Sequence, residues 1–176
     1  MEERLRNTLS TVNEWVRFAE GKNAALLVAD GAAVFGIFQV HAGRDLHWAI
    51  DLYSVVAITL LVASAAICLV SFVPELRISW SSSPKQTSPK DNLLFYGHIA
   101  NYSPREYLES LCRQSNTSVE SLGQIQEYYA EQIVVNSRIA RAKYRCFNSA
   151  VFLTLSAILT PVLVPIIYKL RDQSKE

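Results

Sequence analysis

The chain has 176 residues, 50% of them hydrophobic, and its formal net charge is +1 at pH 7. This length allows one modest domain, and the near-neutral charge gives no reason to expect a nucleic-acid partner. The sequence also has no phosphate-binding glycine loop and no HExxH, CxxC or GxSxG pattern, so we expect no enzyme.

Residues 1–23 are predicted to form a cytoplasmic amphipathic helix. Its apolar residues recur at steps of three and four positions: Leu5, Leu9, Val12, Val16 and Ala19. Trp15 and Lys22 fall close to the point where this helix would enter a membrane, where aromatic and basic side chains are favoured. We therefore expect both residues to contribute to membrane attachment or gating. The first 20 residues are too polar for a signal-peptide core, so the first membrane helix should be retained.

Three apolar stretches are suited to crossing a bilayer as helices: 24–41, 52–73 and 147–168. The second and third have 22 residues each without a charge. A helix rises about 1.5 Å per residue, so each can cross a hydrocarbon core of roughly 30 Å. Pro161 and Pro165 would kink the last helix, or mark one that does not cross fully. The sequence thus predicts an all-α, polytopic membrane protein with three transmembrane helices, the first two forming a hairpin.

Basic residues are distributed unevenly among the connecting segments. Residues 74–146 contain nine Lys or Arg, whereas the loop 42–51 contains one. The positive-inside bias therefore places the N-terminus and residues 74–146 in the cytoplasm. The tail 169–176 would then lie outside, although it has three Lys or Arg. Trp48 and Tyr53 flank the external loop as expected for interfacial anchors.

Residues 74–146 are predicted to form a linker and then a helical unit between the second and third membrane helices. The linker, SSSPKQTSPKD at 81–91, has two prolines and no apolar periodicity. Ser103 and Glu106 then form a capping-box pattern with a proline between them. This pattern predicts a short helix that ends near Cys112.

A second, much longer helix is predicted to follow. Residues 117–120 form another capping-box pattern, and no proline interrupts the chain from there to Pro161. One apolar stripe runs along this region: Leu122, Ile125, Tyr129, Ile133, Asn136, Ala140, Tyr144 and Phe147. We expect a single helix that leaves the cytoplasm and becomes the third membrane helix.

Asp30 is the one acidic residue inside the first apolar stretch. A carboxylate at the bilayer centre costs about 2.5–3.5 kcal/mol on insertion scales, so it should face a partner helix or water. One interpretation is a gating or pore-lining residue. The other is a carboxylate near the cytoplasmic edge that is hydrogen-bonded to another helix.

Polar residues gather just before the third membrane stretch: Asn136, Arg138, Arg141, Lys143 and Tyr144. Four cations within the eight residues 138–145 would suit an anionic ligand such as a nucleotide phosphate. They would equally suit anionic lipid headgroups, or simply follow the positive-inside bias. Asn136 lies on the apolar stripe, where a polar side chain often fixes the register of packed helices.

Tyr96 and His98 surround Gly97 at the start of the helical unit. The two side chains would be able to stack on a base and hydrogen-bond to it. The alternative is a turn packed against the helices, for which a glycine needs no ligand. The three cysteines and three histidines are scattered, so we expect no disulfide, no metal site and no cofactor.

Three motifs taken together resemble a known family. WVRFAEGK at 15–22 precedes the first membrane stretch, FYGHIA at 95–100 opens the cytoplasmic segment, and QIVVNSRIARAKY at 132–144 precedes the last stretch. In this order they resemble the Pycsar transmembrane effectors of bacterial antiphage defence, over residues 10–170. Glu20 stands where an aspartate is expected.

The resemblance implies a function and a location. A companion cyclase, triggered by phage, makes cyclic CMP or cyclic UMP. The effector responds by impairing the bacterial inner membrane, which stops growth before phage are released. The implied partners are the lipid bilayer and the cyclic pyrimidine mononucleotide, as ligand rather than cofactor.

Other functions and the assembly state are also open to prediction. The residues alone are compatible with a non-catalytic membrane anchor or scaffold for a cytoplasmic partner, and with a channel or toxin that needs no nucleotide. Small residues at Ala32, Gly36 and 63–66 favour close helix contacts. Because three helices do not easily enclose an aqueous path, we expect a homo-oligomer.

Overall fold

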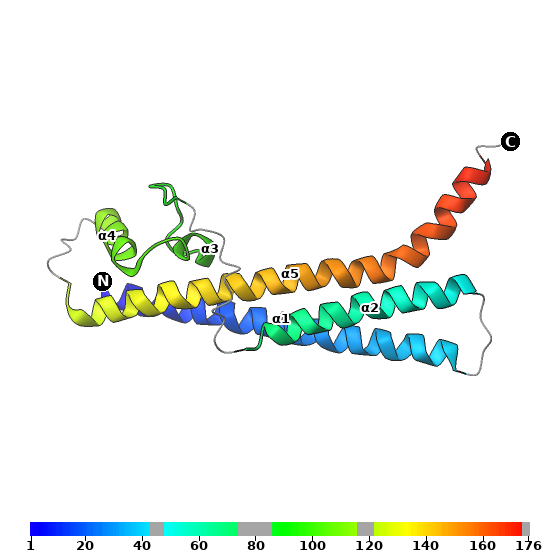
Figure 1. Cartoon of the computed structure of the whole chain (residues 1–176). Coiled ribbons are helices and arrows are strands. Elements are labelled where there is room, and N and C mark those ends of the chain that lie inside the picture. The colour runs from blue at the N-terminus through cyan, green and yellow to red at the C-terminus, as the bar shows by residue number, and fades with distance from the viewer. Residues whose placement is uncertain (43–47, 74–85, 116–121, 174–176) are drawn as a thin grey trace. The chain divides into compact units, whose positions relative to one another are not determined.

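A computed structural model describes residues 1–42, 48–73, 86–115 and 122–173, the last range with side chains up to residue 160. The described residues are all-helical, which confirms the predicted class. The helices are α1 (Glu2–His41), α2 (Trp48–Val70), α3 (Tyr96–Ile99), α4 (Pro104–Ser115) and α5 (Gln124–Gln173) (Figure 1). The second predicted capping box, at 117–120, lies outside the described residues.

The chain divides into two compact units. Unit 1 contains Met1–Gly21 and Val73–Arg145, and unit 2 contains Lys22–Phe72 and Cys146–Glu176. Both α1 and α5 continue without a break from one unit into the other. The single long helix predicted after residue 120 is therefore confirmed as a helix, while its membrane crossing stays a prediction.

Unit 1 has an apolar core between the first half of α1, the first half of α5 and the α3–α4 segment. Leu5, Val12 and Ala19 are fully buried, which confirms the predicted apolar face of the N-terminal helix. Leu5 and Val12 share the core with residues of the other elements: Leu93, Ile99, Tyr102, Tyr107, Leu108, Leu111, Ala130, Ile133 and Val134. The hydroxyl of Tyr107 donates a 3.0 Å hydrogen bond to the Leu93 carbonyl, so the polar end of this buried ring is satisfied.

The predicted capping box at the start of α4 is confirmed. The Ser103 N–H donates to the Glu106 carboxylate at 2.9 Å, and the Glu106 N–H donates to the Ser103 hydroxyl at 3.3 Å. These bonds satisfy two donors at the helix start. The helix continues to Ser115, slightly beyond its predicted end near Cys112.

The short helix α3 was not predicted from the sequence. Tyr96, Gly97 and His98 were expected before a helix, and they form one of their own. It has only four residues and no side-chain cap, so it lacks the start signals by which longer helices are recognised. A side chain at Gly97 would begin 2.5 Å from the Phe95 ring, which explains the glycine there.

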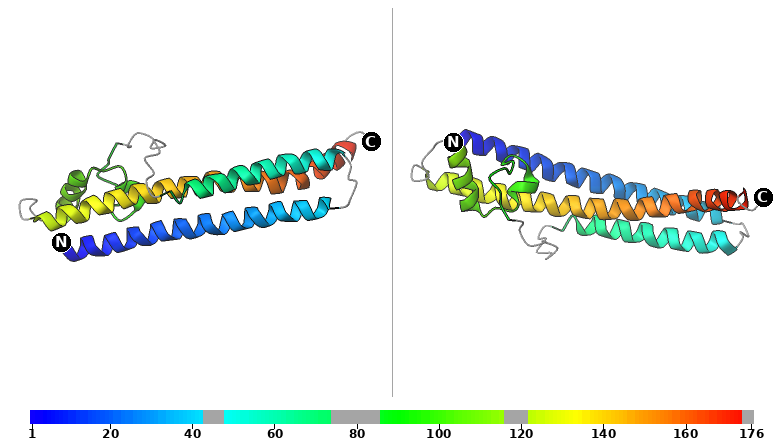
Figure 2. Two further views of the ribbon diagram at one scale, coloured as in Figure 1. Left: turned by 60° about the horizontal axis from the view of Figure 1, so that its bottom comes forward. Right: turned by 90° about the horizontal axis from the view of Figure 1, so that it is seen from above.

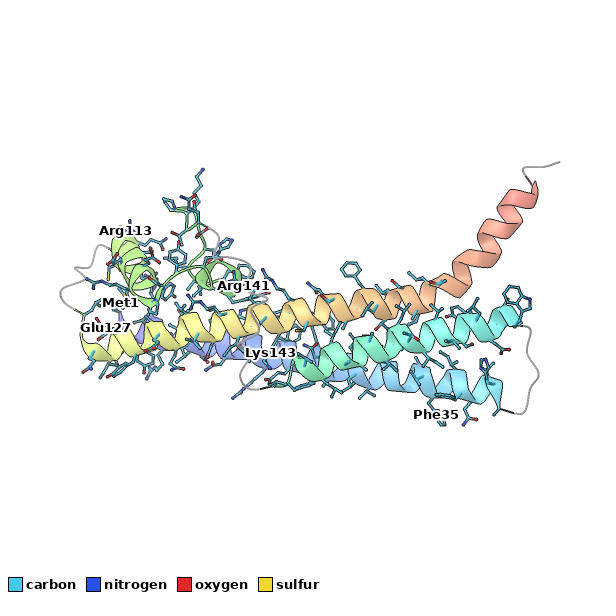
Figure 3. The ribbon with its side chains drawn as sticks, viewed as in Figure 1. Met1, Phe35, Arg113, Glu127, Arg141 and Lys143 are labelled. Atoms are coloured by element: carbon cyan, nitrogen blue, oxygen red, sulfur yellow. The ribbon has the colours of Figure 1, made fainter. Side chains whose placement is uncertain are left out.

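Unit 2 consists of the second half of α1, α2 and the rest of α5. A small core joins the three helices around Ala57, Leu61 and Ala157, and Figure 2 shows the helices from two further directions. Many large apolar side chains are exposed instead, including Phe35 (63%), Val55 (62%) and Phe152 (71%). Phe35 points away from the helices in Figure 3. Such an apolar exterior is typical of helices that face lipid.

Two helices in the described part are long and apolar enough to cross a membrane, Glu2–His41 and Trp48–Val70. They contain the first predicted membrane stretch, 24–41, and most of the second, 52–73. The third predicted stretch, 147–168, lies within α5 and includes residues whose side chains are not described. Its crossing, like the domain boundaries and the cytoplasmic location of residues 74–146, stays a prediction.

Candidate functional site

Arg138 and Arg141 of α5 both bind the end of α3. Arg138 donates to the carbonyls of Ala100 and Tyr102 at 3.3 and 2.9 Å. Arg141 donates to the Asn101 side-chain oxygen at 2.6 Å and to the Ala100 carbonyl at 3.3 Å. A helix end leaves carbonyls without partners, and cationic donors are favoured there. The two arginines therefore hold the segment between α3 and α4 against α5.

The environment of Arg141 is unusual for a guanidinium. Burial lowers its pKa, and the nearby charges of Arg145 and Arg138 lower it further. Arginine stays protonated in proteins, so Arg141 keeps its positive charge. The carbonyl and amide oxygens that it binds are neutral and do not balance this charge. This electropositive region of unit 1 is the one that the sequence predicted, and Figure 3 labels Arg141 within it.

Lys143 and Asn136 connect α5 to α1 within unit 1. The Lys143 ammonium lies 3.0 Å from the Glu20 carboxylate, and its side chain is only 7% exposed. The Asn136 amide donates to the Asn13 side-chain oxygen at 2.8 Å. Partly buried polar pairs of this kind help to fix which residues of two helices face each other. The ligand-binding roles predicted for both residues stay predictions.

An aromatic cluster lies beside these cations. The Tyr96 and Tyr144 rings are stacked, with centroids 5.2 Å apart and an interplanar angle of 17°. Trp15 contacts both, at 5.5 Å from Tyr96 and 6.3 Å from Tyr144. Burial raises the pKa of the Tyr96 and Tyr144 phenols. The Phe95 ring also lies against Tyr96, with centroids 4.7 Å apart, so three rings surround it, and its predicted stacking on a base stays a prediction.

His98 helps to hold the turn before α3. Its Nδ1 atom accepts a 2.8 Å hydrogen bond from the Asn92 backbone N–H. A nitrogen that accepts a hydrogen bond carries no proton. His98 Nδ1 therefore does not donate to the Asp91 carboxylate, which lies 3.9 Å away. The structure therefore gives His98 a positioning role and leaves its predicted contact with a base as a prediction.

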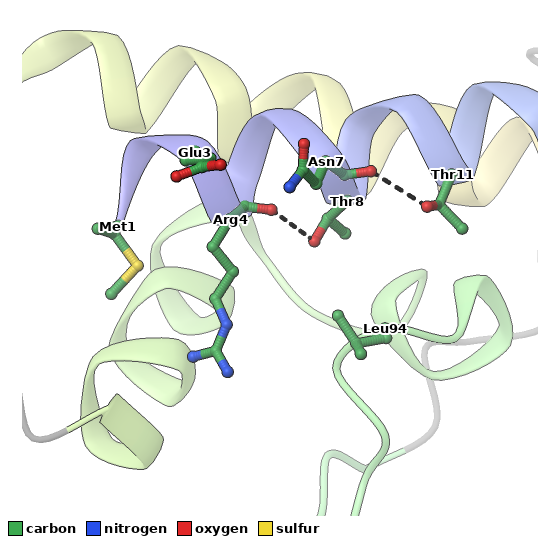
Figure 4. A pocket seen from close by; sticks show the side chains of 7 residues that line it. All are labelled: Met1, Glu3, Arg4, Asn7, Thr8, Thr11 and Leu94. Carbon is green, nitrogen blue, oxygen red and sulfur yellow. Dashed lines mark hydrogen bonds between the residues drawn. The ribbon is translucent and has the colours of Figure 1, made fainter.

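A cavity of about 540 Å³ lies on the first turns of α1 (Figure 4). Five of its seven lining residues are polar or charged: the lining consists of Met1, Glu3, Arg4, Asn7, Thr8, Thr11 and Leu94. Thr8 and Thr11 donate to backbone carbonyls of α1, so their hydroxyls are partly used. Within the described residues, neither the Arg4 guanidinium nor the Asn7 amide makes a hydrogen bond or ion pair. No residue of this cavity was predicted from the sequence as a ligand-binding residue.

A second cavity in unit 1, of about 370 Å³, lies beside the loop 87–91 and the end of α4. Its cation, Arg113, donates to the Glu109 carbonyl and the Ser110 hydroxyl. Its carboxylate, Asp91, accepts from the Tyr102 hydroxyl at 3.1 Å and from the Ser88 N–H at 3.0 Å. These groups are committed to internal bonds, so the cavity near Arg4 is the better candidate for an anionic ligand.

Asp30 lies in a buried polar network of unit 2. It is fully buried, and its Oδ1 atom accepts a 2.7 Å hydrogen bond from the Thr154 hydroxyl of α5. The Thr154 hydroxyl lies 2.9 Å from that of Ser64 in α2. The expectation that Asp30 faces a partner helix is confirmed, and its gating role stays a prediction. From the sequence, Ser64 was expected only to favour close helix packing and Thr154 was not singled out, because small hydroxyl residues are common in membrane helices.

Lys22, which like Trp15 was predicted to contribute to membrane attachment or gating, lies at the start of unit 2, and for both residues that role stays a prediction. Its ammonium is 5.3 Å from the centroid of the Phe147 ring, within range of a cation–π interaction. Within the described ranges, no group of three His, Cys, Asp or Glu residues is suited to holding a metal ion.

Comparison with known proteins gives a consistent result. The sequence model of the Pycsar effector protein domain matches residues 4–169. The chain is similar to the Pycsar effector protein PtPycTM of Propioniciclava tarda, with 27% identity over 86% of this chain and 72% of that protein. It is also similar to the Pycsar effector protein RsPycTM of a Rhizobium species, with 28% identity over 88% of this chain and 89% of that protein. No solved structure matches the chain.

Proposed function

Because this chain belongs to the Pycsar effector family, we propose that it responds to cyclic CMP or cyclic UMP by impairing the bacterial inner membrane. The observation that carries the proposal is the extent of the family match, which covers residues 4–169 and hence parts of both units. One unit has polar cavities, and the other has helices suited to a bilayer. We therefore expect ligand binding in unit 1 and membrane damage through unit 2.

The cavity at Arg4 is the proposed nucleotide site. Its volume of about 540 Å³ falls within the range usual for small-molecule sites. The Arg4 guanidinium would bind the cyclic phosphate through charge-assisted bonds, and Asn7 would both donate to and accept from a pyrimidine edge. Glu3 also lines the cavity, and its carboxylate would favour a ligand with one negative charge over one with several.

The residues predicted from the sequence support this site indirectly. Arg138 and Arg141 hold the segment that follows α3, and Leu94, which lines the cavity, lies just before α3. His98 fixes the turn at Asn92, close to Leu94 in the chain. We expect Tyr96, Asn136, Lys143 and Tyr144 to support the binding segment from the α5 side.

Binding to the purified full-length chain in neutral detergent tests this site. Calorimetry should detect cyclic CMP or cyclic UMP with the wild-type chain, and Arg4→Gln should weaken binding at least tenfold. The matched control is Arg6→Gln, an exposed arginine that does not line the cavity, and it should bind as the wild type does. Neutral detergent excludes anionic lipid as the competing ligand. Equal binding by Arg4→Gln would move the site to the Arg138–Arg141 region, and no binding by wild type would contradict the function.

The proposed location is the inner membrane, with the N-terminus and residues 74–146 in the cytoplasm. The uneven distribution of basic residues supports this orientation. Single-cysteine labelling at Thr87 and at Ala42, in a chain without its natural cysteines, tests it in intact cells. A membrane-impermeant reagent should label position 42 and not position 87, and the reverse pattern would contradict the orientation.

A homo-oligomer is part of the proposal, since one chain has too few helices to surround an aqueous path. The small residues of the first two membrane stretches support close contacts between copies. Chemical crosslinking in membranes should give a ladder of species above the monomer. A monomer alone, with and without nucleotide, would contradict both the oligomer and a pore.

A further inference from the structure

The Asp30 carboxylate is buried without a compensating cation in the described part of unit 2. Its exposed fraction is 0%, and its Oδ2 atom has no hydrogen-bond partner there. The ammonium of Lys22, two helical turns earlier in α1, lies over the Phe147 ring. An ionised carboxylate in an apolar region is costly unless it is paired, and taking up a proton removes that cost.

Two hydroxyls extend from this carboxylate as a chain. The Thr154 hydroxyl donates to Asp30 Oδ1 at 2.7 Å, and the Ser64 hydroxyl lies 2.9 Å from Thr154 Oγ1. Ser64 and Thr154 also lie 3.1 and 3.2 Å from the Ala150 carbonyl. One group comes from each of α1, α2 and α5, so the chain exists only when these three helices are packed together. Figure 1 shows the three helices of this unit.

The distances favour a proton over a metal cation as the occupant. The side chains of Asp30, Thr154 and Ser64 and the Ala150 carbonyl all present oxygen atoms. Hard cations prefer oxygen ligands, which in the case of calcium lie at about 2.3–2.6 Å. However, the oxygens are already within hydrogen-bond distance of one another, so hydroxyl protons occupy the space between them. A proton needs no additional space, and Asp30 Oδ2 is the open position that would receive it.

We infer that Asp30, Thr154 and Ser64 form a proton-binding site in unit 2, and that the proposed impairment of the membrane is a passage of protons through this site. This inference rests on the proposed function for the leak, but not for the binding of a proton. The O–H bond at Asp30 Oδ2 forms when a proton arrives and breaks when it leaves, so no oxidant or reductant is required. The neighbouring titratable group is Cys68 of α2, which interacts electrostatically with Asp30 and also with Cys146 of α5.

Infrared spectroscopy tests the proton site without any nucleotide. The full chain in lipid vesicles at pH 7 should show the C=O stretch of a protonated carboxylic acid, with the small shift expected in heavy water. Asp30→Asn should remove this band. Asp51→Asn is the matched control, because Asp51 is a carboxylate of the same unit that is 53% exposed and lies 3.4 Å from His41. The Asp51→Asn variant should keep the band. The same band in wild type and Asp30→Asn would overturn the inference.

Proton flux tests the leak. Vesicles containing the chain and a trapped pH dye receive cyclic CMP or cyclic UMP while a pH gradient is present. Wild type and Asp51→Asn should dissipate the gradient, Asp30→Asn should do so at least tenfold more slowly, and Asp30→Glu should retain part of the rate. Equal rates in Asp30→Asn, or release of a larger trapped dye together with protons, would overturn proton passage through Asp30. If wild type dissipates nothing, the proposed function fails, and the infrared result decides the proton site by itself.

Discussion

The Tyr53 hydroxyl of α2 donates a 2.6 Å hydrogen bond to the Ala157 carbonyl of α5. In a regular helix this carbonyl would accept from the N–H of residue 161, but residue 161 is proline and has no N–H. Tyr53 therefore supplies the donor that the proline removes. In a bilayer no water is available to do so, and neighbouring helices must satisfy such groups. Figure 1 shows that α5 changes direction in this C-terminal part.

The first prediction concerns this bond. Tyr53→Phe should destabilise unit 2 by about 0.5–2 kcal/mol, because it leaves a buried carbonyl without a donor. In a Pro161→Ala background the helix regains its own N–H, so the same change should cost much less. Unfolding in mixed detergent micelles measures the four free energies of this double-mutant cycle. Additive effects would show that Tyr53 does not compensate for the proline.

The second prediction concerns the arginines of α5. Arg138→Gln should release the segment 96–103 from α5, because it removes two charge-assisted bonds to backbone carbonyls. Each hydrogen bond to a charged group contributes about 1.5–3 kcal/mol to stability. Hydrogen exchange of this segment should therefore accelerate at least tenfold in the variant. Arg105→Gln is the control, since its ion pair with Glu109 is exposed and should matter little. Unchanged exchange in Arg138→Gln would assign this cation to topology or lipid contact alone.

The third prediction concerns the start of α4. Ser103→Ala should cost about 1 kcal/mol, the usual value for losing a helix cap, whereas Glu109→Gln in the same helix should cost less. Chemical denaturation of the full chain in detergent, monitored by the hydrogen exchange of α4 amides, measures both free-energy costs. Equal costs would mean that the capping box contributes nothing.

The same capping box predicts a pH dependence. The Ser103 N–H, and then the Ser103 hydroxyl, lower the pKa of Glu106 below its ordinary value. The folded pKa is thus below the unfolded one, so the contribution is fully present above the unfolded value of about 4.3 and is lost as the pH falls through the folded pKa. Because Glu106 is exposed, the effect should be small and should weaken with salt. Glu106→Gln should remove it, and an unchanged acid profile in that variant would contradict the assignment.

Local patterns in the sequence predicted the local structure well. The capping box of Ser103 and Glu106, the apolar face of Leu5, Val12 and Ala19, and the inward position of Asp30 each depend on neighbours in one helix. They follow from periodicity, from cap chemistry and from the cost of a charge in hydrocarbon.

Contacts between distant segments were not predictable in the same way. The carbonyls bound by Arg138 are 36 and 38 residues away in the chain, and they become acceptors only because α3 ends at Ile99. Tyr53 was expected to be an interfacial anchor, and its bond to Ala157 depends on how α2 and α5 pack. Sequence spacing contains no information about either relationship.

The most direct test of the central claim is nucleotide-triggered leakage by the purified full-length chain in vesicles. Cyclic CMP or cyclic UMP, added outside vesicles whose cytoplasmic face is outward, should dissipate an ion gradient, and cyclic AMP at the same concentration should not. Empty vesicles and vesicles containing Arg4→Gln should retain the gradient. A wild-type chain that is inserted and folded, yet leaves the gradient intact with both pyrimidine nucleotides, would contradict the account.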